Sequence, residues 1–221
     1  LLKDGKPFFY LADTCWSAFT NITDDEWDYY LYKRKVQGFN TIQINILPQW
    51  DASVTDLNYS PFINGDPYQL NDEYFNHAKQ MCIKAKEEGF TLALVVLWCN
   101  YVPGTWASKM IPDGILPFDC LSNYVEKVHK TFTDLEPLYI ISGDTDFPTD
   151  ETINYYEHVA SVLKGLAPSC LYTTHIKGRY SYIPETLYSY LDLIFYQSGH
   201  NAEDLSMPYS LSEEIQNKYP G

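Results

Sequence analysis

Polar and aromatic side chains follow nearly every apolar run of this chain, and these are the residues whose types could carry out chemistry. Two carboxylates, Asp13 and Asp144, stand directly after such runs, and Asp146 lies close to Asp144 in sequence. A carboxyl group can act as a general acid when burial or a neighbouring carboxylate raises its pKa. A loop carboxylate can equally cap a helix or support a turn, so the residues alone leave a structural role open for both.

Aromatic rings and hydrogen-bonding side chains accompany these carboxylates. Such a set suits a sugar, because its apolar ring face stacks on an aromatic ring while its hydroxyls pair with polar groups. The alternative is that the tryptophans belong to the core and the histidines are structural. The candidates for sugar contact are Asp13, Trp16, Gln43, Asn45, Trp50, Trp98, His175, Gln197 and His200.

The sequence lacks the motifs that are typical of metal sites, serine hydrolases and activated cysteine nucleophiles. The pair His175 and His200 has no third ligand at the spacing of a zinc motif such as HExxH, so we expect no metal and no other cofactor. The chain has no G-x-S-x-G turn, which argues against a serine hydrolase. Its 5 cysteines are widely spaced without a CxxC, and nothing marks a base that would activate Cys15 or Cys99.

Short apolar runs alternate with longer amphipathic stretches along the chain. The expected strands are Pro7–Leu11, Asn40–Leu47, Thr91–Trp98, Leu138–Ser142, Leu171–Thr174 and Leu193–Gln197. The expected helices are Thr23–Gln37, Asp72–Glu88, Cys120–Thr133, Asp150–Leu166, Glu185–Tyr190 and Ser210–Lys218. Six strand-helix units in succession call for a parallel sheet, because each parallel connection needs a crossover.

Two α/β architectures fit this alternation: an open doubly wound sheet and a (β/α)8 TIM barrel. The dinucleotide-binding version of the first has a glycine-rich turn after its first strand, and here that turn is Ala12–Trp16, which has no glycine. In a barrel, function gathers at the carboxyl ends of the strands, which is where the candidate residues stand. Six units leave no room for a second domain, so we expect residues 1–221 to form one.

Four segments carry a resemblance to a known family. DGKPFFYLADTCW, GFNTIQINIL, LYIISGDTDF and FYQSGHN, in this order, resemble the apiosidase-like catalytic domain family, that is, glycoside hydrolase family 140 and its uncharacterised relatives. The resemblance implies a (β/α)8 barrel and a retaining mechanism with two carboxylates. It implies that Asp144 is the acid/base, although Ser142 replaces the first glycine of the family's G-G-D.

The same resemblance leaves part of the mechanism outside the chain. The family's nucleophilic glutamate follows a seventh strand, so we expect it, with the last one or two βα units of the barrel, beyond residue 221. The expected function is hydrolysis of plant polysaccharide side chains, with pectic apiosides as the family's best-known target. The alternative is a non-catalytic carbohydrate-binding or inactive barrel protein that lacks the nucleophile.

Composition limits the partners. The net charge of −14 argues against nucleic acid and anionic membranes, which repel an acidic protein. No apolar run approaches the roughly 20 residues of a membrane span. Aromatic residues make up 16% of the chain, with 20 tyrosines, which suits an oligo- or polysaccharide partner, although tyrosine also packs well at half-buried positions. We expect a secreted, periplasmic or cell-surface location from the substrate alone, and the sequence does not indicate an oligomeric state.

Overall fold

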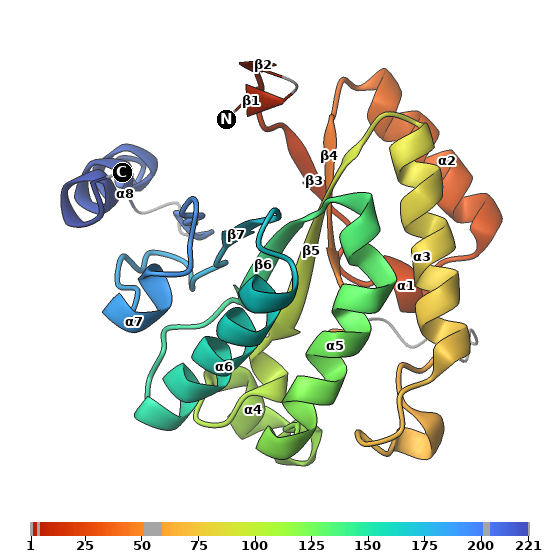
Figure 1. Cartoon of the computed structure of the whole chain (residues 1–221). Helices are drawn as coiled ribbons and strands as arrows, with labels where there is room; N and C mark the ends of the chain where they lie inside the picture. The colour runs from red at the N-terminus through yellow and green to blue at the C-terminus, as the bar shows by residue number, and fades with distance from the viewer. Residues whose placement is uncertain (1, 4, 51–58, 201–203, 221) are drawn as a thin grey trace.

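The computed structural model describes residues 2–3, 5–50, 59–200 and 204–220. A five-stranded parallel sheet forms its centre (Figure 1). The strands are β3 (Ala12–Thr14), β4 (Thr41–Asn45), β5 (Thr91–Trp98), β6 (Leu138–Gly143) and β7 (Leu171–Thr173). A separate short hairpin pairs β1 (Leu2–Lys3) with β2 (Lys6–Pro7).

Helices follow the strands in alternation. They are α1 (Ala18–Asn21), α2 (Asp24–Val36), α3 (Asp72–Glu87), α4 (Trp106–Met110), α5 (Leu121–Phe132), α6 (Asp150–Leu166), α7 (Glu185–Tyr188) and α8 (Met207–Lys218). In the described ranges, five single 3-10 turns also occur, at Ile63–Gly65, Cys99–Tyr101, Pro112–Gly114, Phe118–Cys120 and Thr133–Leu135.

The order of the strands decides between the two expected architectures. Each described strand pairs with the next one along the chain, in the order β3-β4-β5-β6-β7, and every pairing is parallel. A doubly wound sheet reverses its strand order at a switch point, whereas this sheet does not reverse. The sheet is therefore an arc of a (β/α)8 barrel, which confirms the predicted fold class.

Buried tyrosines tie the outer helices to the sheet. The hydroxyl of Tyr74 on α3 donates to the carbonyl of Ile46 at 2.6 Å, and that of Tyr124 on α5 donates to the carbonyl of Val96 at 2.5 Å. On the sheet, the Tyr172 hydroxyl donates to the carbonyl of Leu163 in α6 at 3.0 Å. A buried hydroxyl needs such a partner, so part of the tyrosine content of this chain serves its core.

The first predicted strand was placed too early. The ladder with β4 begins at Ala12 rather than in the apolar run Pro7–Leu11. The Asn40 side chain takes the place of a neighbouring strand there, since its Oδ1 accepts from the Leu11 N–H at 3.0 Å and its Nδ2 donates to the Phe9 carbonyl at 2.6 Å. Phe9 itself is 78% exposed, so an apolar run here does not mark a buried strand.

The sixth predicted strand, Leu193–Gln197, is also not a regular strand. A single parallel bridge joins His175 to Phe195, and the Phe195 N–H donates to the Thr173 hydroxyl instead of to a carbonyl. Asp192 likewise accepts from the Tyr172 N–H through its side chain, at 2.9 Å. Side chains thus replace main-chain partners along this edge, which periodicity does not reveal.

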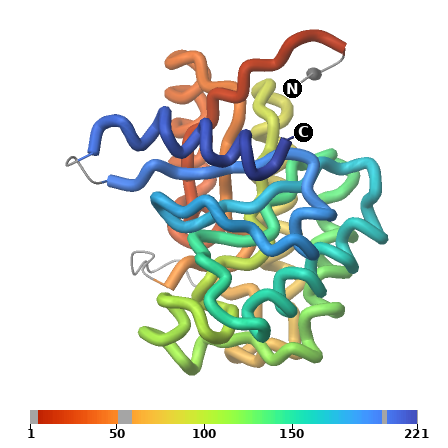
Figure 2. Tube along the Cα trace, turned by 90° about the vertical axis from the view of Figure 1, so that its left-hand side faces the viewer, coloured from red at the N-terminus to blue at the C-terminus, as the bar shows by residue number. Residues whose placement is uncertain are grey.

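The C-terminal helix lies along this last segment. Figure 2 shows α8 running beside the stretch 191–200, and residues of both line one groove. The helix begins at Met207 rather than at the predicted Ser210, because Pro208 stands in its first turn, where a proline is tolerated. Among the described residues, no helix is long and apolar enough to span a membrane.

Candidate functional site

The carboxyl edge of the sheet brings the candidate residues of four chain segments together. Asp144 follows β6, His175 follows β7, Trp98 ends β5, and Trp16 follows β3. In Figure 1 the arrow of β5 points toward α4, which marks this edge. Gln197 joins the group from the segment after the His175–Phe195 bridge.

Three hydrogen bonds hold Asp144 in place. Its N–H donates to Nδ1 of His175 at 3.1 Å, and its carbonyl accepts from the indole N–H of Trp106 at 2.8 Å. Its carboxylate Oδ1 accepts from Nε2 of Gln197 at 2.6 Å. The backbone has φ 49°, a left-handed conformation that aspartate adopts more readily than most residues. The half-buried carboxyl group is thus fixed through main chain and side chain together.

His175 is held in one tautomer by this arrangement. A backbone N–H can only donate, so Nδ1 must be the unprotonated acceptor and Nε2 carries the proton of the neutral ring. Burial lowers the pKa of His175, and the charge of Asp144 opposes that effect only in part. The ring is therefore a neutral donor at Nε2, not a cation.

Aromatic rings surround the imidazole. The Trp98 ring stacks on His175 with centroids 5.6 Å apart at 29°, and the Trp16 ring meets the same imidazole edge-on at 5.6 Å. The two indoles are 5.3 Å apart. Gly143 makes this packing possible, because a Cβ at that position would lie 2.0 Å from Cε3 of Trp98. The glycine before Asp144 thus admits a close approach of the ring.

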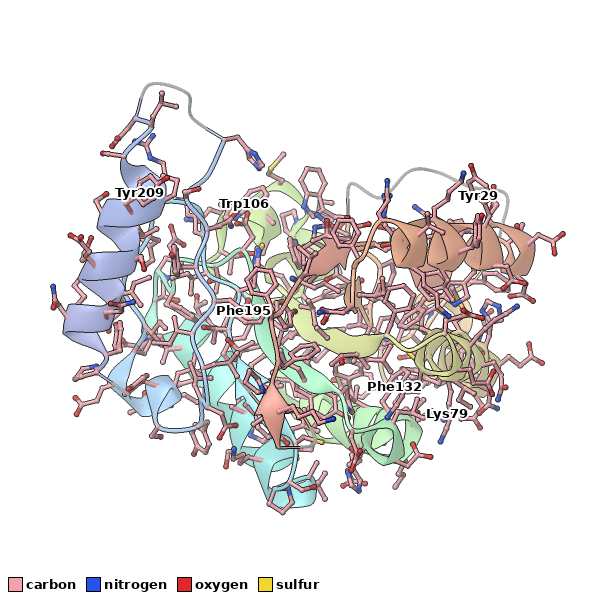
Figure 3. The ribbon with its side chains drawn as sticks, turned by 90° about the horizontal axis from the view of Figure 1, so that it is seen from above. Tyr29, Lys79, Trp106, Phe132, Phe195 and Tyr209 are labelled. Atoms are coloured by element: carbon pink, nitrogen blue, oxygen red, sulfur yellow. The ribbon has the colours of Figure 1, made fainter. Side chains whose placement is uncertain are left out.

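The inner side of the arc contains a small cavity. Its volume is about 320 Å³, and its lining includes Thr14, Trp16, Gln43 and His175. Tyr10 and Phe195 also line it, with ring centroids 5.1 Å apart. Figure 3, seen from above, shows Phe195 between Tyr29 of α2 on one side and Tyr209 of α8 on the other. The cavity therefore adjoins the aromatic cluster around His175.

Several buried polar atoms at the same edge have no hydrogen-bond partner in the described protein. They are the amide oxygens of Asn45 and Asn100 and the indole nitrogens of Trp50 and Trp98. Asn45 is 2% exposed and Trp98 4%. Burying a polar group without a partner costs free energy, so such groups call for an explanation. Because these atoms are enclosed by protein, they are not presented to a ligand in this structure.

Asp13 is not brought into this group. Its Oδ2 accepts from the Tyr30 hydroxyl at 2.7 Å and pairs with Nε of Arg34, and both of these residues lie on α2. The Asp13 carboxylate therefore joins β3 to the outer helix. His200 is exposed. It directly precedes residues 201–203, and these three residues lie outside the described part of the chain.

Three residues around the site were not among the candidates from the sequence. Trp106 holds the Asp144 carbonyl, Tyr10 lines the inner cavity, and Asn100 has one of the unpartnered amides. Asn100 stands just after the predicted strand Thr91–Trp98, so its place alone could have made it a candidate. Trp106 lies six positions beyond Asn100, on a short helix that no periodicity marks, and Tyr10 stood inside the misplaced strand.

The site offers carboxylate and hydrogen-bonding chemistry rather than a ligand set for a metal. Within the residues that the structure describes, no group of three or more His, Cys, Asp or Glu side chains could hold a metal ion. Asp146 is paired with Lys177 at 2.9 Å. Asp144 thus remains the carboxyl group with the closest ties to the imidazole and the indoles.

Comparison with known proteins gives the family. The family described as "Apiosidase-like, catalytic domain" matches residues 1–221. The chain belongs to this family. The match confirms the resemblance of the four segments, and no curated protein sequence matches the chain.

Solved structures agree on the fold. A glycoside hydrolase family 5 protein from Bacteroides vulgatus has a TM-score of 0.73 at 23% identity, covering 99% of this chain and 48% of its own. A structure titled "Glycoside hydrolase" has a TM-score of 0.72 at 21% identity, with coverage of 99% and 51%. An endo-1,4-beta-mannanase from Rhizomucor miehei reaches 0.58 at 14% identity, with coverage of 78% and 57%.

The apiosidase-like chain has a glycoside hydrolase fold. It spans about half the length of the first two structures, 48% and 51%. Because these identities are below a quarter, the likeness concerns the fold, and the chemistry must be argued from the site itself.

Proposed function

We propose that this apiosidase-like protein is a retaining glycoside hydrolase in which Asp144 is the general acid/base. The observation that carries the proposal is the position of Asp144. Its carboxyl group is half-buried at the carboxyl edge of the barrel arc, hydrogen-bonded to Gln197 and adjacent to the Trp98–His175 stack. This is the edge at which barrel enzymes carry out their chemistry.

The hydrogen bonds support different roles for the two carboxyl oxygens in this proposal. Oδ1 accepts from Gln197, so the acidic proton belongs on Oδ2. In the first step Oδ2–H protonates the leaving oxygen, and in the second the carboxylate takes a proton from water. The indole of Trp16, which lines the cavity, offers a face to a sugar ring, and the enclosed Trp98 supports it at a centroid distance of 5.3 Å.

A retaining mechanism needs a second carboxylate about 5–5.5 Å from the acid. We propose that this nucleophile follows a seventh strand, as the family resemblance implies. Activity therefore has to be tested on the full-length protein.

The finer proposal concerns substrate and location. The family name and the aromatic site support plant polysaccharide side chains as substrates, with pectic apiosides first among them. Such polymers lie outside the cell, so we propose that the protein acts as a secreted, periplasmic or cell-surface enzyme. A glycan-release screen on pectic and neutral plant polysaccharides identifies the sugar.

Replacement of Asp144 by Asn tests the mechanism. The Asn variant cannot donate the proton, so kcat on glycosides with poor leaving groups should fall by about 10²–10⁴-fold. Aryl glycosides with activated leaving groups should lose far less in the first step. Equal losses on both substrates would contradict the assignment. Sugar binding without turnover by the unaltered protein would instead favour a carbohydrate-binding protein.

A further inference from the structure

The side chain of Gln197 is placed to hold the carboxyl group of Asp144 rather than to bind a sugar. Its Nε2 donates to Oδ1 of Asp144 at 2.6 Å and to the carbonyl of Ile176 at 2.9 Å. Because the Ile176 carbonyl can only accept, it fixes which end of the amide is the nitrogen. Both N–H groups of the amide are then used inside the protein.

The main chain holds Gln197 as firmly as its side chain does. Its carbonyl accepts from the N–H of Arg179 at 2.8 Å, and the bridge between His175 and Phe195 lies two residues before it. A Cβ on Gly178 would lie 3.7 Å from the Gln197 amide carbon, so the two segments are in close contact. The amide is thus presented to Asp144 from a segment that main-chain contacts hold on both sides.

From these contacts we infer that Gln197 is a positioning residue, which directs Oδ2 of Asp144 toward the leaving oxygen. This inference rests on the proposed function of Asp144. With Oδ1 held by the amide, the same Oδ2 faces the leaving oxygen in the first step and the attacking water in the second.

The other titratable groups around Asp144 do not offer the same control. On the β7 side, burial lowers the pKa of His175, which keeps it neutral. Burial raises the pKa of Cys99 after β5 and of Tyr156 on α6, so both stay protonated. Asp146, two residues along, is paired with Lys177. Among these groups, the Gln197 amide is therefore the side-chain donor to the Asp144 carboxylate.

The test is Gln197→Met in the full-length protein, which keeps the length of the side chain and removes both donors. Misdirection of Oδ2 should lower kcat on poor leaving groups by about 10–100-fold, with KM within about 2-fold. Aryl glycosides with activated leaving groups, which need less proton transfer, should lose far less. Gln216→Met, an exposed position on α8, is the matched control and should change neither quantity.

Two results would overturn the inference. A raised KM with unchanged kcat would make Gln197 a sugar ligand, and equal losses of kcat on all substrates would make it merely structural. If Gln197→Met does not fold, Gln197→Asn serves instead, because it keeps the amide but is one methylene too short to hold Asp144 in the same way. Asp144→Asn separates the two hypotheses: if that variant keeps full activity, the proposed function fails, whereas if only Gln197→Met keeps full kcat, this inference fails.

Discussion

His175 shows how a single backbone donor determines the chemistry of a side chain. The N–H of Asp144 occupies Nδ1, so a second proton on the ring would face that donor at 3.1 Å. Between two indoles the charged ring would also lose its hydration. The residue is thus suited to donate a hydrogen bond through Nε2 and not to act as a base.

The neutral state of His175 predicts a pH dependence of stability. Its pKa is lower in the folded than in the unfolded chain, so the unfolded state binds the proton first. The contribution is therefore present above the ordinary pKa of about 6.5 and is lost as pH falls below it, with a slope of at most about 1.4 kcal/mol per pH unit.

Urea unfolding of His175→Asn at pH 8 and pH 5 measures this contribution. Asn keeps an acceptor for the Asp144 N–H and does not titrate, so the variant should lose less stability on acidification than the unaltered protein. His129→Asn, on α5 and outside the site, serves as the control. An unchanged pH slope in His175→Asn would show that the histidine does not carry the effect.

Gly143 should be among the least tolerant glycines of the chain. A Cβ there would lie 2.0–2.7 Å from three ring atoms of Trp98, and a buried indole cannot yield easily. We expect Gly143→Ala to destabilise the fold by about 1–3 kcal/mol and to change the tryptophan fluorescence. Gly165→Ala, in α6 with open space around it, should instead stabilise by about 0.5–1 kcal/mol. Equal effects of the two substitutions in denaturant titrations would refute the packing argument.

At the scale of elements, the ion pair between Asp13 and Arg34 connects β3, the first strand of the central sheet, to helix α2. The carboxylate also accepts from Tyr30, and only 21% of its side chain is exposed. Hydrogen bonds to a charged group contribute about 1.5–3 kcal/mol. Asp13→Asn should therefore lower the free energy of unfolding by about 1–3 kcal/mol while leaving kcat/KM nearly unchanged at low temperature.

A matched pair of variants separates the two roles considered for Asp13. Asp28→Asn removes the more exposed ion pair with Lys84, which also lies between elements, and should cost less than about 1 kcal/mol. If Asp13→Asn loses activity without losing stability, Asp13 contacts the substrate, as the sequence analysis expected of it.

The sequence predicted those elements whose signals are local. The helix Asp24–Val36 begins at a capping box of Thr23 and Glu26, and Thr91–Trp98 is a continuous apolar strand. Where side chains replace main-chain partners, at Asn40 and Thr173, the strand boundaries could not be read from periodicity. These two replacements account for the misplaced first strand and for the reduction of the sixth to a bridge.

The candidate site was predictable to the extent that strand ends share one edge. This rule brought Asp144, His175 and Trp98 together, because the carboxyl ends of parallel strands meet. The same rule does not tell on which side of a strand a side chain lies. Asp13 was therefore grouped with the site residues, although its carboxylate faces α2. The rule also gave no signal for Trp106, whose contact with Asp144 depends on a loop conformation.

At the scale of the whole molecule, the net charge of −14 conflicts with one part of the proposed substrate range. The galacturonan backbone of pectin is itself anionic, so the protein and the polymer repel one another. The screening length falls from about 30 Å at 0.01 M salt to about 8 Å at 0.15 M. On intact pectin, kcat/KM should therefore rise several-fold over this range.

Neutral substrates provide the control for this prediction. An aryl glycoside or a neutral oligosaccharide should show nearly the same kcat/KM at both salt concentrations, since no long-range repulsion opposes its approach. Equal salt responses of pectin and the neutral substrate would show that the acidic surface lies away from the path of the polymer.

The consecutive strand order also has a consequence for biosynthesis. Ribosomes add about 5–20 residues per second, from the N-terminus onward. Along the described sheet each strand pairs with the one made just before it, so β4 finds β3, and β5 finds β4, already outside the ribosome. The order of synthesis and the order of pairing coincide. The nascent chain can therefore fold one strand and one helix at a time, extending its sheet from a single growing edge.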